Sequence, residues 1–186
     1  MIVTVPNSVL TSPAKKVEKI DKKILSIVSK MKKDLIDANK PKGVGLAAPQ
    51  IGVPLRIFIT RPTEKSPIRV FMNPEILARS ETVSEIVRED DGKPNVRREK
   101  KLEGCLSIPN VWGHLKRATW VKLKYMDEHG EEKVETFQGF LATIVQHETD
   151  HLNGVLFTQR VIEQKEKLYS IETNINGEEQ WEEIAV

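Results

Sequence analysis

The sequence has little cysteine and little aromatic content. Its one cysteine is Cys105, and phenylalanine, tyrosine and tryptophan together make up 5% of the 186 residues. A single cysteine excludes a disulfide within the chain. Because no secretory signal opens the sequence, we expect a cytoplasmic protein in which this thiol is reduced. Cys105 is then a small buried apolar residue, a nucleophile paired with a histidine, or a metal ligand.

Long apolar runs and a strong net charge are also absent. No stretch approaches the length of a membrane span. The formal net charge is only +2, which gives no support to nucleic-acid binding. Apolar residues form 39% of the chain, which is enough for one domain over residues 1–186 with a hydrophobic core. We therefore expect a single domain with neither a DNA nor a membrane partner.

The most informative motif is QHETDH at residues 146–151. His147 and His151 are spaced i, i+4, so on a helix their imidazoles lie on one face and can bind one metal ion. Glu148 is then placed to take a proton from water beside that metal. Apolar residues precede the motif, and Phe140 and Ile144 continue its stripe at helical spacing. This pattern favours a buried metal-binding helix over an exposed helix with two solvated histidines.

A catalytic site of this type has three protein ligands and one open position. Cys105 lies in EGCLS at residues 103–107, where the preceding glycine and nearby Pro109 indicate a specified backbone conformation. A thiolate and two imidazoles would complete the ligand set. A zinc endopeptidase whose third ligand is a downstream acid, with Glu172 as the candidate, remains an alternative.

A third segment, residues 42–52, is rich in glycine and alanine. It is not a phosphate-binding loop, because no Lys-Ser/Thr follows the glycines and the dinucleotide-binding spacing is absent. An accessible backbone suits close approach by an extended peptide, and Gln50 can offer amide donors to an oxyanion. An ordinary loop between a helix and a strand fits the same signals equally well.

Together, GVGLAAPQ at residues 43–50, EGCLS at 103–107 and QHETDH at 146–151 resemble, in this order, the three signature motifs of the peptide deformylases. The resemblance extends from the first predicted helix to about Phe157. It implies a metal-dependent hydrolase that removes the formyl group from N-formylmethionyl nascent peptides and releases formate. It also implies transient association with the ribosome. A non-catalytic peptide-binding relative is a further hypothesis, against which the intact metal ligands and Glu148 argue.

The resemblance assigns roles to individual residues. The implied metal ligands are Cys105, His147 and His151, with Fe²⁺ expected as the native ion and Zn²⁺, Ni²⁺ or Co²⁺ as alternatives. The implied general acid and base is Glu148, and the implied oxyanion donors are the Gln50 side chain and the Leu106 N–H. The implied peptide-binding residues are Gly43, Val44, Gly45, Glu103, Gly104, Phe140 and Ile144. For the apolar ones among them, simple core packing is an equal alternative.

The remaining patterns predict an α+β fold, with mixed or antiparallel strands packed around the central metal-binding helix. Asp21 is expected to cap a helix that ends near Asn39 and buries the stripe Ile24, Val28, Met31 and Leu35. Strands are expected at residues 55–60, at 70–72 before a stop at Asn73-Pro74, and at 121–125 and 133–137 around a turn at 127–130.

Two charged segments are harder to interpret. Residues 80–102 form a charged insertion in which acidic residues precede basic ones, which predicts a hairpin, with a ribosome-docking surface or a lid over the peptide channel as alternatives. Residues 160–171 are predicted to be helical. Residues 172–186 are predicted to be an acidic surface tail with Trp181 packed on the domain, an ending that argues against ribosome contact through a basic C-terminus.

Overall fold

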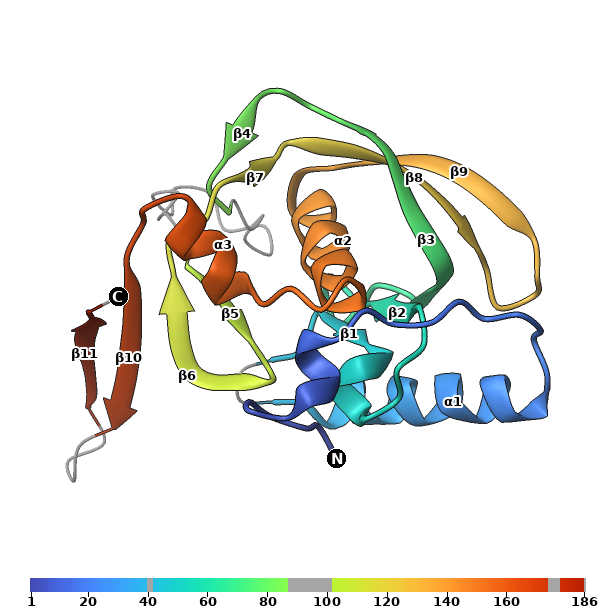
Figure 1. The fold of residues 1–186 in the computed structure, drawn as a ribbon, viewed down its shortest axis with the longest axis horizontal. Coiled ribbons are helices and arrows are strands. Elements are labelled where there is room, and N and C mark those ends of the chain that lie inside the picture. Colours follow the sequence, from blue (N-terminus) through green and yellow to red (C-terminus); the bar gives the residue numbers. More distant parts are fainter. Residues whose placement is uncertain (40–41, 87–101, 174–177, 186) are drawn as a thin grey trace.

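A computed structural model describes residues 1–39, 42–86, 102–173 and 178–185 of the chain (Figure 1). The helices are α1 (Lys22–Asp37), α2 (Gly139–Leu152) and α3 (Phe157–Glu163), with 3₁₀ turns η1 (Ser8–Thr11) and η2 (Ala48–Ile51). A five-stranded sheet has the order β1-β2-β3-β8-β9, formed by β1 (Gly45–Ala47), β2 (Ile57–Thr60), β3 (Arg69–Arg79), β8 (Trp120–Met126) and β9 (Glu132–Gln138).

A second sheet has four strands in the order β11-β10-β6-β5, formed by β5 (Glu103–Cys105), β6 (Ile108–Gly113), β10 (Leu168–Thr173) and β11 (Glu179–Ile184). Two short strands, β4 (Val83–Ser84) and β7 (Arg117–Ala118), form a separate pair. All these pairings are antiparallel. Figure 1 shows α2 at the centre of the molecule, between the two larger sheets. The expected α+β architecture around a central helix is confirmed.

The first helix forms as its sequence predicts. The Asp21 side chain accepts a hydrogen bond from the Ile24 N–H at 2.9 Å, which satisfies one of the unpaired donors of the first turn. The expected apolar stripe is buried beneath the helix. The helix ends at Asp37, close to the predicted end at Asn39.

The β8–β9 hairpin is also confirmed. Val121, Leu123 and Tyr125 alternate as buried residues of β8 and face the main core. Aromatic rings pack there, with centroids of Phe71 4.5 Å from Phe58 and 4.6 Å from Tyr125. α2 packs against this sheet, so the sheet fixes the position of the helix that carries the two histidines.

The predicted stop at Asn73-Pro74 is wrong, because β3 continues through both residues to Arg79. Asn73 adopts a positive φ of 50°, and the pairing with β8 shifts register between Met72 and Glu75. The Asn73 side chain donates to the Val17 carbonyl and accepts from the Val17 N–H, at 2.9 and 2.8 Å. A β-bulge therefore accommodates the proline, which has no N–H to place in the ladder.

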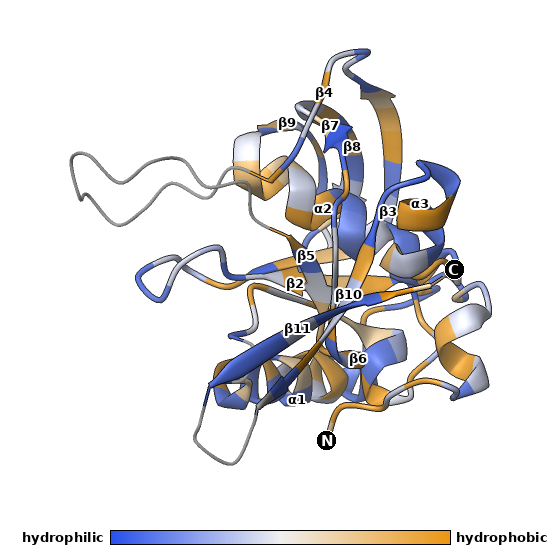
Figure 2. Ribbon diagram, turned by 90° about the vertical axis from the view of Figure 1, so that its left-hand side faces the viewer, coloured by the Kyte–Doolittle hydropathy of each residue, from blue (hydrophilic) through white to orange (hydrophobic). Residues whose placement is uncertain are grey.

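The predicted helix over residues 160–171 is also wrong. α3 ends at Glu163, Lys165 turns the chain with a positive φ of 56°, and β10 begins at Leu168. β10 pairs with β6 and β11. The predicted acidic tail therefore contains a sheet strand, β11, which is hydrophilic in Figure 2. Trp181 is 48% exposed and contacts the Tyr169 ring instead of the main core.

The charged insertion is described only in part. Residues 80–86 include β4 and the buried Ile86, which is 4% exposed. The rest of the hairpin predicted over residues 80–102, namely residues 87–101, lies outside the described residues. Within the part of the chain that the structure describes, no helix is long and apolar enough to cross a membrane.

Candidate metal centre

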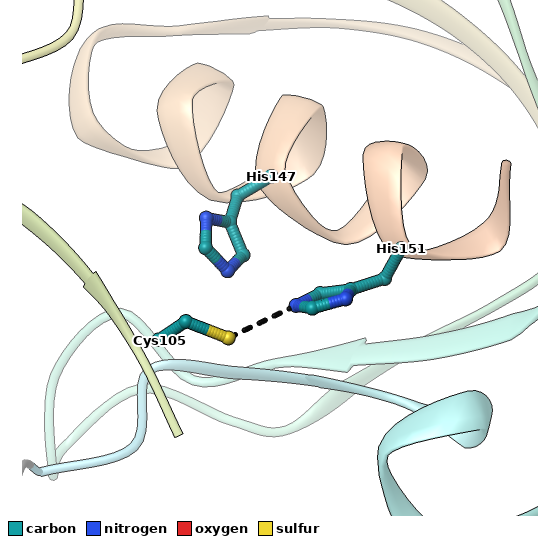
Figure 3. A group of neighbouring side chains, drawn as sticks. All are labelled: Cys105, His147 and His151. Atoms are coloured by element: carbon teal, nitrogen blue, oxygen red, sulfur yellow. Dashed lines mark hydrogen bonds between the residues drawn. The ribbon is translucent and has the colours of Figure 1, made fainter. Parts of the chain in front are cut away.

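The three predicted metal ligands meet at one point (Figure 3). His147 and His151 project from one face of α2, and Cys105 ends β5 opposite them. Their ligand atoms all lie within 4.8 Å of one another, and the Cys105 Sγ is 3.2 Å from the His151 Nε2. Glu172, the alternative third ligand, is exposed on β10 and is not part of this group.

The arrangement fits a divalent metal ion. Metal–sulfur and metal–nitrogen bonds of about 2.0–2.3 Å place tetrahedral ligand atoms roughly 3–4 Å apart, which agrees with the observed cluster. His151 presents Nε2 to the cluster, whereas its other ring nitrogen, Nδ1, is buried without a hydrogen-bond partner in the described structure. Thiolate and imidazole are a donor set for zinc or ferrous iron.

The Glu103 carboxylate fixes the orientation of the His147 ring. The His147 Nδ1–H donates to Glu103 Oε1 at 2.6 Å, so the other ring nitrogen, Nε2, is left to face Cys105 and His151. Burial acts to lower the pKa of His147, but the charge of Glu103 outweighs it and holds this pKa well above 6.5. Ligand histidines in proteins usually have such a partner on the second nitrogen.

Glu103 is itself held by a buried arginine that the sequence reasoning missed. Arg117 donates to Glu103 through Nε and Nη2, at 2.7 and 2.6 Å, and through Nη1 to Asp150 at 2.9 Å. Burial opposes ionisation of Glu103, but the Arg117 charge keeps its pKa well below the ordinary range. Arg117 follows the exposed Lys116 in the sequence, so no local pattern distinguished it as buried, and only the fold shows that it has two carboxylate partners.

Glu148 is 3% exposed and lies beside the cavity. Its Oε2 is a buried atom without a hydrogen-bond partner in the described structure. Burial raises the pKa of Glu148 to about 7. Gly45 passes so close to the Glu148 carboxylate that a Cβ at this glycine would overlap Oε1, and it would also approach Ile144 to 2.8 Å.

The Gln50 amide is locked in one orientation. Its Oε1 accepts from the Ala47 N–H at 2.8 Å. The amide nitrogen Nε2 therefore faces the metal ligands, and it donates to Ser107 Oγ at 3.2 Å. The same nitrogen is 3.5 Å from Cys105 Sγ, and the Ser107 N–H also donates to that sulfur at 3.4 Å. Both donors support a sulfur that carries negative charge as a ligand.

A partly open cavity adjoins these groups. All seven predicted peptide-binding residues line it, as do Gln50, Leu106 and Glu148. The sequence reasoning missed four further lining residues, Lys42, Ile86, Trp112 and Thr143. The Trp112 ring lies against Gly104, where a Cβ would approach the indole to 2.7 Å. Lys42 and Thr143 adjoin predicted residues in the sequence, whereas Ile86 and Trp112 are brought to the cavity from other elements and no local pattern indicates them.

The chain is similar to peptide deformylases along most of its length. The family model for polypeptide deformylase matches residues 1–167. A peptide deformylase of Pseudothermotoga lettingae is 43% identical over 150 residues, which cover 80% of this chain and 75% of the relative. Peptide deformylase 1 of Bacillus subtilis is 38% identical over 160 residues, covering 86% and 88%.

Solved structures agree with the sequence matches. The crystal structure of peptide deformylase from Thermotoga maritima has a TM-score of 0.73 at 32% identity, covering 87% of this chain and 96% of that one. The peptide deformylase from Synechococcus elongatus in complex with actinonin also has a TM-score of 0.73, at 33% identity, covering 87% and 78%.

Proposed function

The chain belongs to the polypeptide deformylase family, and from that membership we propose that one buried carboxylate, Glu148, serves both proton transfers of its reaction. That reaction removes the N-formyl group from nascent polypeptides and releases formate. The observation that carries the proposal is Glu148 Oε2, which has no hydrogen-bond partner among the described residues and lies at the cavity beside Cys105, His147 and His151. A buried carboxylate without a partner is suited to exchange protons with a bound substrate.

When bound to Cys105, His147 and His151, a divalent metal ion supplies a Lewis acid that makes water nucleophilic at neutral pH. Glu148 would accept the proton of the attacking water as its oxygen adds to the formyl carbon. As the tetrahedral intermediate collapses, Glu148 transfers the proton to the leaving amine. The raised pKa of Glu148 supports both roles, because it brings proton uptake and release close to neutral pH.

Negative charge on the formyl oxygen is met by the Gln50 amine and the Leu106 N–H. The Ala47 N–H holds the Gln50 amide so that its NH₂ group faces the cavity, and a substrate oxygen would take the place of Ser107 Oγ or Cys105 Sγ as its acceptor. Leu106 follows Cys105 directly and lines the same cavity, which supports its role as the second donor.

The peptide is bound as an added strand along residues 43–45. Residues 43–45 lead into β1, which is the terminal strand of the five-stranded sheet in the described structure, and this position supports strand addition beside it. Val44, Phe140 and Ile144 line the cavity and suit an apolar, flexible methionine side chain. Backbone pairing also explains tolerance of different residues after the methionine.

The native metal is ferrous iron, with zinc, nickel and cobalt as ions that the same ligands accept. The thiolate of Cys105 is a soft ligand and the two imidazoles are borderline ligands, so this donor set suits all four ions. The supply of each metal in the cell then decides which ion occupies the site. The protein works in the cytoplasm, in transient contact with the ribosome from which formylated chains emerge.

The test is formate release from a short N-formylmethionyl peptide by anaerobically purified protein. Glu148→Gln keeps the shape of the side chain but cannot accept the proton, and it should lower kcat by about 100-fold or more. Cys105→Ala removes a ligand and should abolish both metal retention and formate release. Metal content, measured in parallel, separates loss of the ion from loss of the proton acceptor.

Glu163→Gln, an exposed change on α3, is the matched control and should retain wild-type activity. The proposed role of Glu148 would have to be abandoned if metal-loaded Glu148→Gln released formate at the wild-type rate.

A further inference from the structure

A continuous row of charged side chains leads from the metal site to the surface at α3. His147 donates to Glu103, and Glu103 accepts two hydrogen bonds from Arg117. Arg117 also donates to Asp150 at 2.9 Å. The second carboxylate oxygen of Asp150 accepts from Arg160, through Nη2 at 2.9 Å and Nε at 3.3 Å. The row thus alternates in charge and ends on an arginine.

Burial divides this row into an enclosed part and an accessible end. The side chains of Glu103, Arg117 and Asp150 are 4%, 7% and 12% exposed. Arg160 is 38% exposed and also pairs with Glu163 at 2.9 Å. Carboxylates and guanidinium groups alternate, so two positive and two negative charges balance from Glu103 to Arg160. Each buried charge therefore depends on the next one for compensation.

The position of Asp150 makes the outer arginine relevant to the ligand. Asp150 lies on α2 between His147 and His151, and its two oxygens are divided between Arg117 and Arg160. If Arg160 were absent, Arg117 would be the one arginine among the described residues left to neutralise both Asp150 and Glu103. The Arg117 guanidinium would then shift toward Asp150, and its two hydrogen bonds to Glu103 would weaken.

Resting on the proposed function of this metal site, we propose that Arg160 is a positioning residue for His147, acting through Asp150, Arg117 and Glu103. Arg160 does not touch substrate or metal. The Arg160 guanidinium neutralises one oxygen of Asp150. Arg117 can then keep its two hydrogen bonds to Glu103, and Glu103 in turn orients the His147 ring. The ligand geometry therefore depends on a residue of α3, outside the three sequence motifs.

The test uses the cobalt-loaded protein and measures two properties of the bound ion. The visible absorption of Co²⁺ reports ligand geometry, and the rate of cobalt transfer to a chelator reports how firmly the ligands hold it. Arg160→Gln should change the absorption band and accelerate release by about tenfold, since partners of metal ligands contribute 10- to 100-fold to affinity. Arg160→Lys keeps the charge without the two-pronged contact and should fall between this variant and wild type.

Glu163→Gln is the matched control, because it removes the other partner of Arg160 and leaves the row intact. It should match wild type in both measurements. A purely structural role for Arg160 would lower the melting temperature without changing the Co²⁺ spectrum or release rate, and that result would overturn the proposal. Failure of wild type to release formate would instead refute the proposed function, since the ratio of cobalt release rates is independent of catalysis.

Discussion

Gly45 leaves room for the Glu148 carboxylate because glycine has no side chain. The Glu148 carboxylate occupies the space that a Cβ at residue 45 would need. Gly45→Ala should therefore displace the carboxylate and lower kcat for formate release by about 100-fold, the scale of a lost general base. Steady-state kinetics with a formylmethionyl peptide checks this.

Gly104→Ala is the comparison, because its Cβ would instead displace the Trp112 ring at the cavity wall. That change should act mainly on KM. Equal effects of the two variants on kcat would show that Gly45 does not position Glu148.

Short spacing was sufficient to predict that His147 and His151 lie together, whereas Cys105 was assigned by the resemblance to the family motifs and the groups that orient these residues were not predicted. His147 and His151 are four positions apart, so helical geometry alone brings them together. Arg117 lies 14 positions from Glu103 and 33 from Asp150 along the chain. Such contacts depend on how β5, β7 and α2 pack, and no local pattern encodes that packing.

At the scale of elements, the β8–β9 turn is stabilised by one side chain. Asp127 Oδ1 accepts from the His129 and Glu131 N–H groups at 2.9 and 3.0 Å, and Oδ2 pairs with Lys133. Asp127→Ala should lower the free energy of unfolding by about 1–2 kcal/mol, because both backbone donors lose their acceptor. Asp127→Asn retains an acceptor and should lower it less. Urea denaturation measures both variants.

The same turn predicts a dependence on acid. The Lys133 hydrogen bond is the largest of the contacts that lower the pKa of Asp127 from 3.8 to about 2. A carboxyl group with a depressed folded-state pKa stabilises the fold above its unfolded pKa and loses that contribution as pH falls through the folded value. The difference between wild type and Asp127→Ala should thus shrink between pH 4 and pH 2. An unchanged difference would contradict the assignment.

Elements with strong local signals were predictable, and those set by long-range contacts were not. The Asp21 cap and apolar stripe of α1 are local, as are the alternation and turn of β8 and β9. The extension of β3 through Pro74 requires a bulge and the distant backbone of Val17. The change from α3 to β10 requires β6 as a pairing partner, which a helical apolar pattern does not reveal.

At the scale of the whole molecule, the metal site joins two structural units. Cys105 belongs to the four-stranded sheet, whereas His147 and His151 belong to α2, which packs on the five-stranded sheet. Metal removal should therefore lower the melting temperature of the protein. At a metal concentration 100 times Kd the ion stabilises the folded state by about 2.7 kcal/mol, which corresponds to roughly 5–10 °C for a chain of this size.

Calorimetry of the apo and zinc-loaded forms measures this difference. Cys105→Ala serves as the control and should show little response to added zinc. If the wild-type melting temperature were insensitive to zinc, the ion would not be linking the two units. That residues 1–186 form one domain stays a prediction, which a single cooperative transition would support.

The hydrophilic strand β11 has a consequence for crowded solutions. It is the outermost strand of its sheet in the described structure, and Glu179, Glu182 and Glu183 are exposed along it. An exposed strand edge is a template on which another molecule can add a strand and begin aggregation. Two copies that met edge to edge here would bring rows of like charges together, which opposes such pairing. Glu183 is paired with Lys167, so Glu179 and Glu182 are the charges that should oppose edge-to-edge pairing of two copies.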